Sequence, residues 1–476
     1  MAPNAGILAA GIQAGVAVMG IGGPRKSLED IRRIAAARHL ERTLGPWQLA
    51  GIGIGAIIGM GIYTLTGVGA GNAGPAVILS FAVAGLVCAA ASLAYAEMAC
   101  LMPVAGSAYT YSYVVLGQLI AWVVGWSLFL EYALACSAVA VGWSAYFAGL
   151  MQSIGWTIDP QWLKGPGNGG TFNVPAAAVS IAVAVLLTLG TKESARLNTV
   201  LVGVKLVALC TFVVFALRGF DAGNLEPFAP FGTTGVLTAA ALVFFAFFGF
   251  DAVSTAAEEA RDPGRDMKFG IVGSMLVCTL LYMVVALAAV AALRWDLFAS
   301  NAEPLAHVLR STGYTTVANL VATAAICATP SVLMSLMFGQ TRVSFAMTRD
   351  SLLPRQLSAV HPRFHTPHVI TLLTGVGVAV VAGGFRLDEI AALANAGTLC
   401  AFVAVAVSML VLRRREPGLQ RDFACPAPWL VGPLAVIGCT GLFFYLGQTT
   451  ILFFLLWHAI GLAWYFAAGR RGSTAA

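Results

Sequence analysis

Charged side chains are scarce in this chain. Asp, Glu, Lys and Arg make up 10% of its 476 residues, whereas a soluble domain carries about 25%. Hydrophobic residues account for 59% of the chain, and the mean hydropathy is +0.85. So little charge over so long a chain excludes an ordinary soluble protein. It indicates an all-α polytopic membrane protein, because helices satisfy their own backbone hydrogen bonds in lipid.

The signatures of several other protein classes are also missing. The sequence has no HExxH, G-x-S-x-G or Walker motif, which argues against a membrane enzyme and against an ATP-driven pump. Its nine cysteines form no CxxC pair and fall mostly in apolar runs, so we expect neither disulfides nor a zinc site. The net charge of +6 is dispersed, with no basic stripe that alternates with aromatics, which argues against nucleic-acid binding. We therefore predict that the protein is not an enzyme and holds no cofactor or metal.

Long apolar runs, by contrast, are abundant. Of the 27 Lys and Arg residues, 21 fall on one side of these runs and five on the other, and the positive-inside rule makes the richer side cytoplasmic. We predict a multi-pass protein of the cytoplasmic membrane with both termini in the cytoplasm. Twelve runs have spanning length, and they lie near residues 47–67, 75–97, 118–150, 173–190, 199–217, 236–257, 270–292, 316–347, 368–384, 390–412, 428–446 and 449–468.

Two of these spans contain features that interrupt a helix. The first, GIGIGAIIGMGIY (51–63), has five glycines, and the sixth, FFAFFGFDAVSTAAEE (244–259), has Gly249 close to Asp251. They hold the same position in two successive blocks of five spans, which is typical of transporters that bind substrate between broken helices at the membrane midplane. Close helix packing is the alternative role for the glycines. A dinucleotide-binding loop is a weaker one, since no acidic residue follows about 20 positions later.

Ionisable residues inside the spans are candidate functional residues, because a charge at mid-membrane is expensive. Lys205 is the only charge in the fifth span and Glu131 the only charge in the third. Glu131 has a structural alternative, as a hydrogen-bond partner inside the bundle, and Asp251 has one, as a cap for the second half of the sixth span. Glu97, at the end of the second span, is predicted to belong to an exposed charged rim.

Eight longer segments carry more specific patterns. They are GIGAIIGMGIYTLTG (53–67), AGPAVILSF (73–81), YAEMACLMPVAGSAYTYSY (95–113), EYALACSAVAVGWSAYF (131–147), ESARLN (193–198), FFAFFGFDAVSTAAEEARDPGRDM (244–267), GQTRVSFAMTRDSLLP (339–354) and GTLCAFVAVAVSMLVLRR (397–414). Together they resemble the cationic amino acid transporter branch of the amino acid–polyamine–organocation superfamily. This resemblance, over about residues 45–468, implies a LeuT-type fold: a 5+5 inverted repeat with broken helices 1 and 6, plus two peripheral helices. Residues 1–46 would be a cytoplasmic N-terminal extension, 47–412 the ten-helix transport core, and 413–476 two C-terminal transmembrane helices and a short tail.

The resemblance also implies a substrate site at the two breaks. The substrate carboxylate would bind amides at the start of the second half of helix 1, where the helix dipole favours an anion, and the α-ammonium would bind carbonyls at the ends of the first half-helices. An aromatic lid, Phe245, and Asp251 would gate the site. The residues predicted to bind the carboxylate are Gly59, Met60 and Gly61, and those predicted to bind the ammonium through their carbonyls are Ile57, Phe245, Ala246 and Phe248. From its charge within the third span, Glu131 is a further candidate substrate residue, in the cavity wall.

The resemblance further implies a coupling role for Lys205. In sodium-coupled proteins of this fold a cation bridges helices 1 and 8, and here the ammonium of Lys205 would take its place, reaching carbonyls of helix 1 and Ser331 on helix 8. Two positions differ from many relatives: Met60 replaces a hydroxyl residue, and Ser127 replaces a carboxylate. Fewer negative charges make a neutral or broad substrate range at least as consistent with the sequence as a cationic one.

We therefore predict a secondary amino-acid transporter driven by protons, whose partners are its amino-acid substrate, protons and the lipid bilayer. An amino-acid/amine exchanger is the alternative. A passive channel is less consistent with the sequence, because it would need a continuous polar pore and the spans offer few polar stripes.

Overall fold

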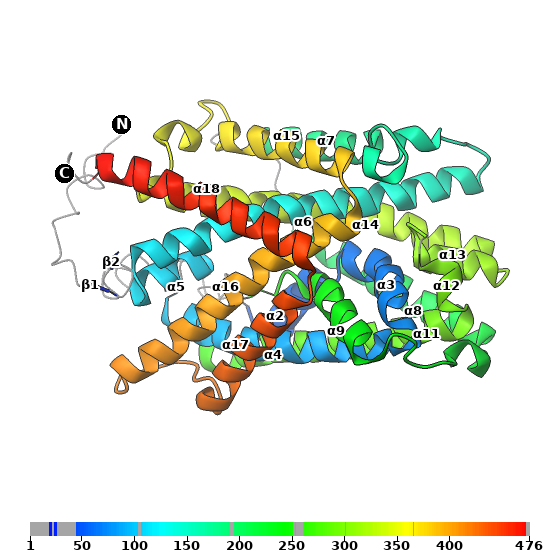
Figure 1. Ribbon diagram of the computed structural model, residues 1–476, viewed down its shortest axis with the longest axis horizontal. Helices are drawn as coiled ribbons and strands as arrows, with labels where there is room; N and C mark the ends of the chain where they lie inside the picture. Colours follow the sequence, from blue (N-terminus) through cyan, green and yellow to red (C-terminus); the bar gives the residue numbers. More distant parts are fainter. Residues whose placement is uncertain are drawn as a thin grey trace.

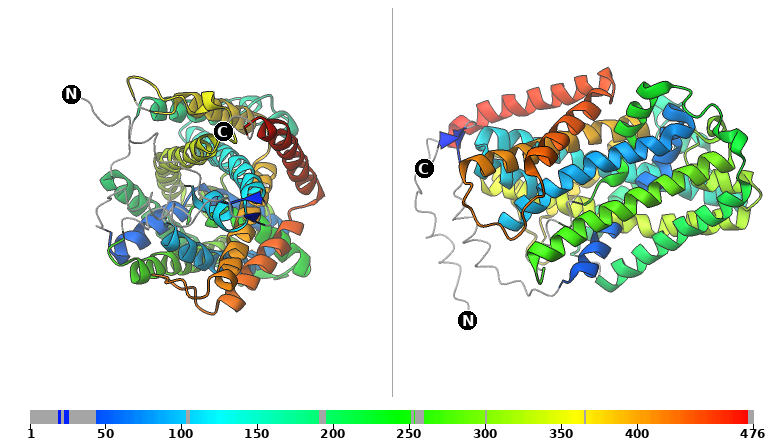
Figure 2. Two further views of the ribbon diagram at one scale, coloured as in Figure 1. Left: turned by 90° about the vertical axis from the view of Figure 1, so that its left-hand side faces the viewer. Right: turned by 90° about the horizontal axis from the view of Figure 1, so that it is seen from below.

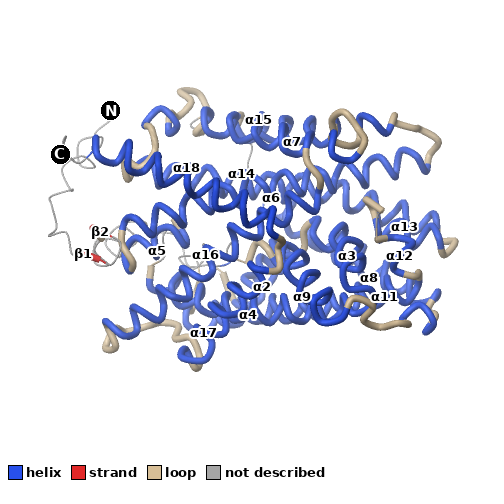
Figure 3. The backbone as a smooth tube through the Cα atoms, viewed as in Figure 1, coloured by secondary structure: helices blue, strands red, loops and turns tan. Residues whose placement is uncertain are grey.

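The computed structural model describes residues 19–20, 23–25, 44–102, 106–190, 195–250, 253, 260–299, 301–364 and 366–472, and these are almost entirely helical (Figures 1 and 3). Two short strands, β1 (Met19–Gly20) and β2 (Gly23–Pro24), pair antiparallel ahead of the first helix. The prediction of an all-α polytopic membrane protein is confirmed, since seven apolar helical stretches of the described residues are long enough to cross a membrane and four shorter ones accompany them.

The helices follow one another along the chain, with the connections from α6 to α7 and from α14 to α15 among the longer ones. Their bounds are α2 (Pro46–Ile57), α3 (Met60–Ala73), α4 (Val77–Leu101), α5 (Ser107–Val115), α6 (Gln118–Ser153), α7 (Val174–Thr188), α8 (Ala195–Ala216), α9 (Gly232–Val243), α11 (Pro263–Ala292), α12 (Trp295–Phe298), α13 (Pro304–Ser311), α14 (Thr315–Arg349), α15 (His368–Gly384), α16 (Leu387–Arg415), α17 (Pro428–Phe444) and α18 (Gln448–Gly472). Short 3-10 helices lie between them, of which η6 (Phe244–Phe247) extends α9.

The long helices pack side by side into one bundle, seen end-on in Figure 2. α6 packs on both α14 and α16, α11 packs on α2 and α4, and α7 lies beside α15 at one edge (Figure 1). In α16, 78% of the most apolar window is buried inside the protein, against 17% in α18. α16 is therefore a core helix and α18 a peripheral one.

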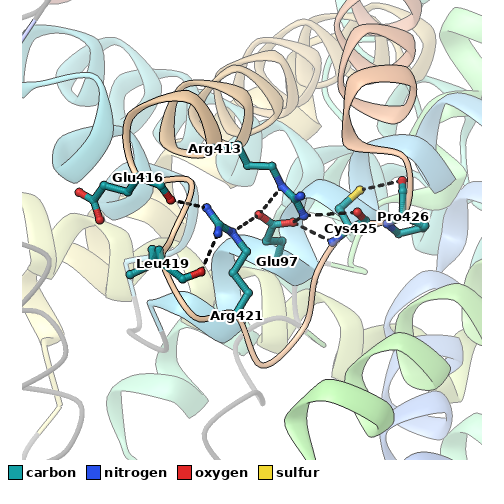
Figure 4. Close-up of polar contacts among 7 residues, drawn as sticks. All are labelled: Glu97, Arg413, Glu416, Leu419, Arg421, Cys425 and Pro426. Atoms are coloured by element: carbon teal, nitrogen blue, oxygen red, sulfur yellow. Dashed lines mark hydrogen bonds and ion pairs between the residues drawn. The ribbon is translucent and has the colours of Figure 1, made fainter.

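One expectation about charge is wrong. Glu97, near the end of α4, is not part of an exposed rim: its side chain is 1% exposed and accepts hydrogen bonds from Arg413 Nε at 2.9 Å, Arg421 Nε at 3.0 Å and Cys425 N at 2.7 Å (Figure 4). The connection from α16 to α17 folds back over the end of α4 and buries the carboxylate. Removing one partner of such a buried pair costs about 3–5 kcal/mol, so this cluster firmly ties α4 to α16.

Candidate functional site

The predicted interruption of the first span is present. α2 ends at Ile57, α3 begins at Met60, and a single tight turn joins them. Ile58 has φ −74° and ψ 86°, and the Gly59 N–H donates to the Ile57 carbonyl at 2.8 Å, which is the geometry of an inverse γ-turn. The chain thus changes direction within two residues, and the first amides of α3 have no acceptor inside their own helix.

The sixth span loosens more gradually. α9 passes into the 3-10 helix η6, and Phe248 is extended with φ −58° and ψ 142°. Gly249 follows with φ +106°, a conformation that favours glycine. Asp251, the expected gate, lies outside the described residues.

The two interrupted segments touch each other through glycine. A Cβ added at Gly61 would lie 2.7 Å from Ala246 Cα, and one added at Gly249 would lie 2.5 Å from the Ala56 carbonyl oxygen. By contrast, a Cβ at Gly59 would meet only ordinary contacts, the nearest being Val332 Cγ1 at 3.5 Å. Close packing, the alternative considered for the glycines, therefore accounts for Gly61 and Gly249 but not for Gly59. It also accounts for Gly53 and Gly55, where an added Cβ would clash with Ser274 and Val202.

Lys205 lies where α8 meets both halves of the first span. Its side chain is 3% exposed, and its Nζ donates to the Gly55 carbonyl near the end of α2 at 3.3 Å. That carbonyl loses its usual helical partner, since the Gly59 N–H turns to Ile57 instead. The backbone carbonyl of Lys205 accepts from the Tyr63 hydroxyl on α3, also at 3.3 Å. Lys205 thus contacts the carbonyl end of α2 and the body of α3 at once.

Two polar side chains that the sequence analysis missed also bind carbonyls at the interruptions. The Tyr282 hydroxyl on α11 is 2.9 Å from the Ile57 carbonyl and 3.0 Å from the Ala246 carbonyl. Asn395 Nδ2 on α16 is 2.7 Å from the Ala241 carbonyl and 3.0 Å from the Leu242 carbonyl (both in α9). Each is a polar residue in an apolar run, which was the available signal, but the sequence does not say which carbonyls they reach.

A cavity of about 260 Å³ opens beside the interruptions. It brings together three of the predicted site residues, Phe248, Lys205 and Ser331. The Ser331 hydroxyl donates within its own helix, to the Ala328 carbonyl at 2.9 Å. The described residues that line the cavity are Ile52, Gly55, Ala56, Ser107, Tyr132, Lys205, Phe248, Gly249, Ser331, Val332, Ser335, Leu336, Phe338, Gly339, Arg342 and Val343.

Several other predicted site residues lie behind the cavity wall. Met60 is 1% exposed and packs against Gly142 of α6. Phe245 is 6% exposed, and its ring stacks on that of Phe248 with 6.2 Å between centroids. Phe248 in turn packs edge-on against Tyr132 at 5.9 Å. The rings of Phe245, Phe248 and Tyr132 thus form an aromatic layer, of which Phe248 and Tyr132 line the cavity and Phe245 lies behind them.

Glu131 occupies the interface between α6 and α16. It is 3% exposed, and a Cβ added at Gly397 of α16 would lie 3.1 Å from Glu131 Cβ. Its neighbour Tyr132 lines the cavity, whereas Glu131 does not. One turn earlier, Ser127 Oγ lies 2.8 Å from His458 Nε2 on α18. Glu131 and Ser127 therefore face other helices, whereas Tyr132 faces the cavity.

A helical membrane protein with two interrupted spans beside a cavity has the architecture typical of membrane transporters. Comparison with known proteins defines the class further: the model of the amino acid permease family matches residues 44–464, and the chain belongs to that family. The predicted membership of the amino acid–polyamine–organocation superfamily is thereby confirmed. The protein is a transporter for amino-acid substrates rather than an enzyme.

Similar proteins cover nearly the whole chain. It is 44% identical to the branched-chain amino acid permease BcaP of Bacillus subtilis over 454 residues, which are 94% of this chain and 98% of the relative. It is 39% identical to the methylthioribose transporter of Bacillus subtilis, again over 94% of this chain and 98% of the relative. The vacuolar cationic amino acid transporter 4 of Arabidopsis thaliana is 35% identical over 83% of this chain and 67% of its own length.

Proposed function

We propose that the protein is a secondary active transporter that couples the uptake of neutral amino acids to protons. Its helices would form the LeuT-type arrangement of two inverted five-helix repeats and two peripheral helices, which makes twelve spans. Both termini would face the cytoplasm, and the protein would lie in the cytoplasmic membrane. The observation that carries the proposal is the hydrogen bond from the buried Lys205 Nζ to the Gly55 carbonyl, beside the interruption of the first span.

The substrate would bind between the two interruptions. The amides of Met60 and Gly61 are the first of α3 and lie at the positive end of its dipole, which suits an α-carboxylate. The Gly59 amide is already bonded to Ile57, so Gly59 would contribute the turn rather than a donor. Carbonyls of Phe245, Ala246 and Phe248 would accept the α-ammonium.

The remaining site residues have gating and supporting roles in this proposal. Phe245, stacked on Phe248, would be the lid over the substrate. Asp251, the acidic residue close to Gly249 in the sixth span, would be a second gate. Glu131 supports the α6–α16 contact behind the cavity-lining Tyr132.

The charge of the cavity favours a neutral substrate range. Among its described lining residues the ionisable side chains other than tyrosine are Lys205 and Arg342, both cationic. The buried Lys205 would repel a cationic substrate side chain, since charges interact more strongly where water is excluded. Arg342, which is exposed, adds a second positive charge. BcaP, at 44% identity, is named for branched-chain amino acids, which agrees with this choice.

Lys205 would act as the proton-dependent element. When protonated, its ammonium binds the Gly55 carbonyl and braces α2 against α8. When deprotonated, it loses the charge-assisted part of this bond, and α2 becomes free to move. Ser331, across the cavity on α14, is the second proposed member of this coupling site.

The test uses purified protein in liposomes with an imposed pH gradient. We expect leucine to accumulate when the outside is acidic, with no effect of sodium. The Lys205→Ala variant should still insert into the membrane but should not accumulate leucine. If the Lys205→Ala variant accumulates leucine with the same pH profile as the parent, the coupling role is refuted. Accumulation driven only by internal amino acid or amine would identify an exchanger, and downhill flux without trans-stimulation would identify a channel.

A further inference from the structure

One buried hydroxyl joins the two interrupted spans. Tyr282 lies in α11, which is continuous across this depth, and its side chain is fully buried. Its hydroxyl is 2.9 Å from the carbonyl of Ile57, the last residue of α2, and 3.0 Å from the carbonyl of Ala246 in η6. Both carbonyls belong to the set that the family resemblance assigns to the substrate ammonium.

The two carbonyl oxygens differ in how many hydrogen bonds they can still accept. A tyrosine hydroxyl has one proton, which here is shared between two acceptors, and a carbonyl oxygen has two lone pairs. The Ile57 oxygen also accepts from the Gly59 N–H at 2.8 Å, so both of its lone pairs are used. In the described part of the chain, Tyr282 is the one donor to the Ala246 oxygen. Ala246 therefore retains capacity for a second donor, and Ile57 does not.

Aromatic packing fixes the position of the hydroxyl. The Tyr282 ring packs against Phe81 of α4, with 5.8 Å between centroids, and against Phe247 of η6 at 5.2 Å. The ring therefore cannot follow one carbonyl without losing contact with its neighbours. A hydroxyl held in this way sets the distance between the end of α2 and η6.

We propose that Tyr282 is a positioning residue that satisfies the Ile57 carbonyl in place of the substrate and holds the Ala246 carbonyl for the substrate's ammonium. This inference rests on the proposed function. On this inference the Ile57 carbonyl does not bind the substrate ammonium directly. The carbonyls that bind it are those of η6 and Phe248. An ammonium has three donors for this set of carbonyls, whereas a hydroxyl has one. The site thus prefers an amino acid to the matching 2-hydroxy acid as long as Tyr282 orients the carbonyls.

The test is the discrimination between leucine and 2-hydroxy-4-methylpentanoate, measured as inhibition constants against labelled leucine in liposomes. Tyr282→Phe keeps the ring and removes the hydroxyl. We expect the preference for leucine to fall about 3-fold to 10-fold, the range for one neutral hydrogen bond, through a higher KM for leucine and little change in maximal rate. A merely structural loss would weaken both ligands alike and leave the ratio unchanged.

Tyr146→Phe is the matched control. Its hydroxyl is equally buried and donates to the Tyr63 carbonyl at 2.8 Å, within α3 and away from the interruption. We expect its preference for leucine to equal that of the parent. If the Tyr282→Phe variant does not insert into the membrane, Phe81→Leu is the second variant. It loosens the packing of the Tyr282 ring and keeps the hydroxyl, so we expect a smaller fall in the preference for leucine.

The outcomes separate this inference from the proposed function. A parent protein that binds neither leucine nor any other amino acid refutes the proposed function itself. A parent that binds leucine, together with an unchanged ratio in Tyr282→Phe, overturns the role of Tyr282 alone. If Tyr282→Phe cannot be measured, an unchanged ratio in Phe81→Leu overturns it.

Discussion

Backbone carbonyls at the two interrupted spans accept hydrogen bonds from different kinds of side chain. In the first, a sharp turn releases the Gly55 carbonyl, and the donor that meets it is the ammonium of Lys205. In the sixth, α9 unwinds gradually, and the donor that meets the Ala241 and Leu242 carbonyls is the neutral amide of Asn395. Backbone released inside a membrane must find a partner within the protein. The bond from a neutral amide does not depend on pH, whereas the bond from an ammonium is charge-assisted and weakens when the amine is deprotonated.

This contrast assigns different roles to the two interruptions. The first carries a donor whose bond is stronger when the donor is protonated, so in the proposed mechanism it responds to the driving force. The second carries a donor whose bonding does not depend on pH, so it can serve as a fixed frame. Tyr282, which binds one carbonyl from each side, connects the two. The variants below, ordered from the largest expected effect to the smallest, test whether this division is real.

The largest effect is expected at the titratable donor. Lys205→Ala should abolish pH-driven accumulation of substrate, because the charge-assisted brace between α2 and α8 is lost. The comparison is with Asn395→Ala, which should transport with the same dependence on external pH as the parent. If the Asn395→Ala variant lost its pH dependence, both interruptions would contribute to the response to protons.

A large effect on stability is expected where the interruptions touch. Gly61→Val places side-chain atoms against the Ala246 backbone, which a Cβ alone would approach to 2.7 Å, and overpacking of this kind costs about 1–3 kcal/mol or more. We expect a clear fall in the midpoint of thermal unfolding in detergent. Gly59→Ala is the control, since its Cβ would meet nothing nearer than 3.5 Å; equal losses in both variants would contradict the packing role of Gly61.

An intermediate effect is expected at the fixed frame. Asn395→Ala leaves two buried carbonyls of α9 without their side-chain donor, at a cost of about 1–2 kcal/mol. The unfolding midpoint should fall by the same amount at pH 6 and at pH 8, because the lost group does not titrate. A loss that appears at only one of these pH values would show that this interruption also responds to protons.

The smallest effect is expected at the backbone of Lys205. Tyr63→Phe removes a hydroxyl that donates to the Lys205 carbonyl at 3.3 Å, a long bond worth about 0.5 kcal/mol. We expect a slight fall in stability and an unchanged pH profile of uptake. A shifted pH profile would mean that the orientation of α8, and not only the ammonium, controls coupling.

The sequence determined the class of the protein and the places of its interruptions. Apolar runs reveal spanning helices because burial in lipid is a matter of composition, and glycines and a lone lysine stand out in such runs for the same reason. The interruption of the first span was predicted from its glycines, and its presence needs no knowledge of how distant helices face each other. The contact of Lys205 with carbonyls of helix 1, by contrast, was expected from the family resemblance and not from the local pattern.

Tertiary structure decided everything that depends on contacts between distant segments. Tyr282 and Ile57 are 225 positions apart, and Asn395 and Ala241 are 154 apart, so no local pattern links them. The burial of Glu97 depends on Arg413 and a loop that folds back from the end of α16. Apolar periodicity shows that a residue is inside a membrane, but only helix packing decides which buried donor meets which free carbonyl.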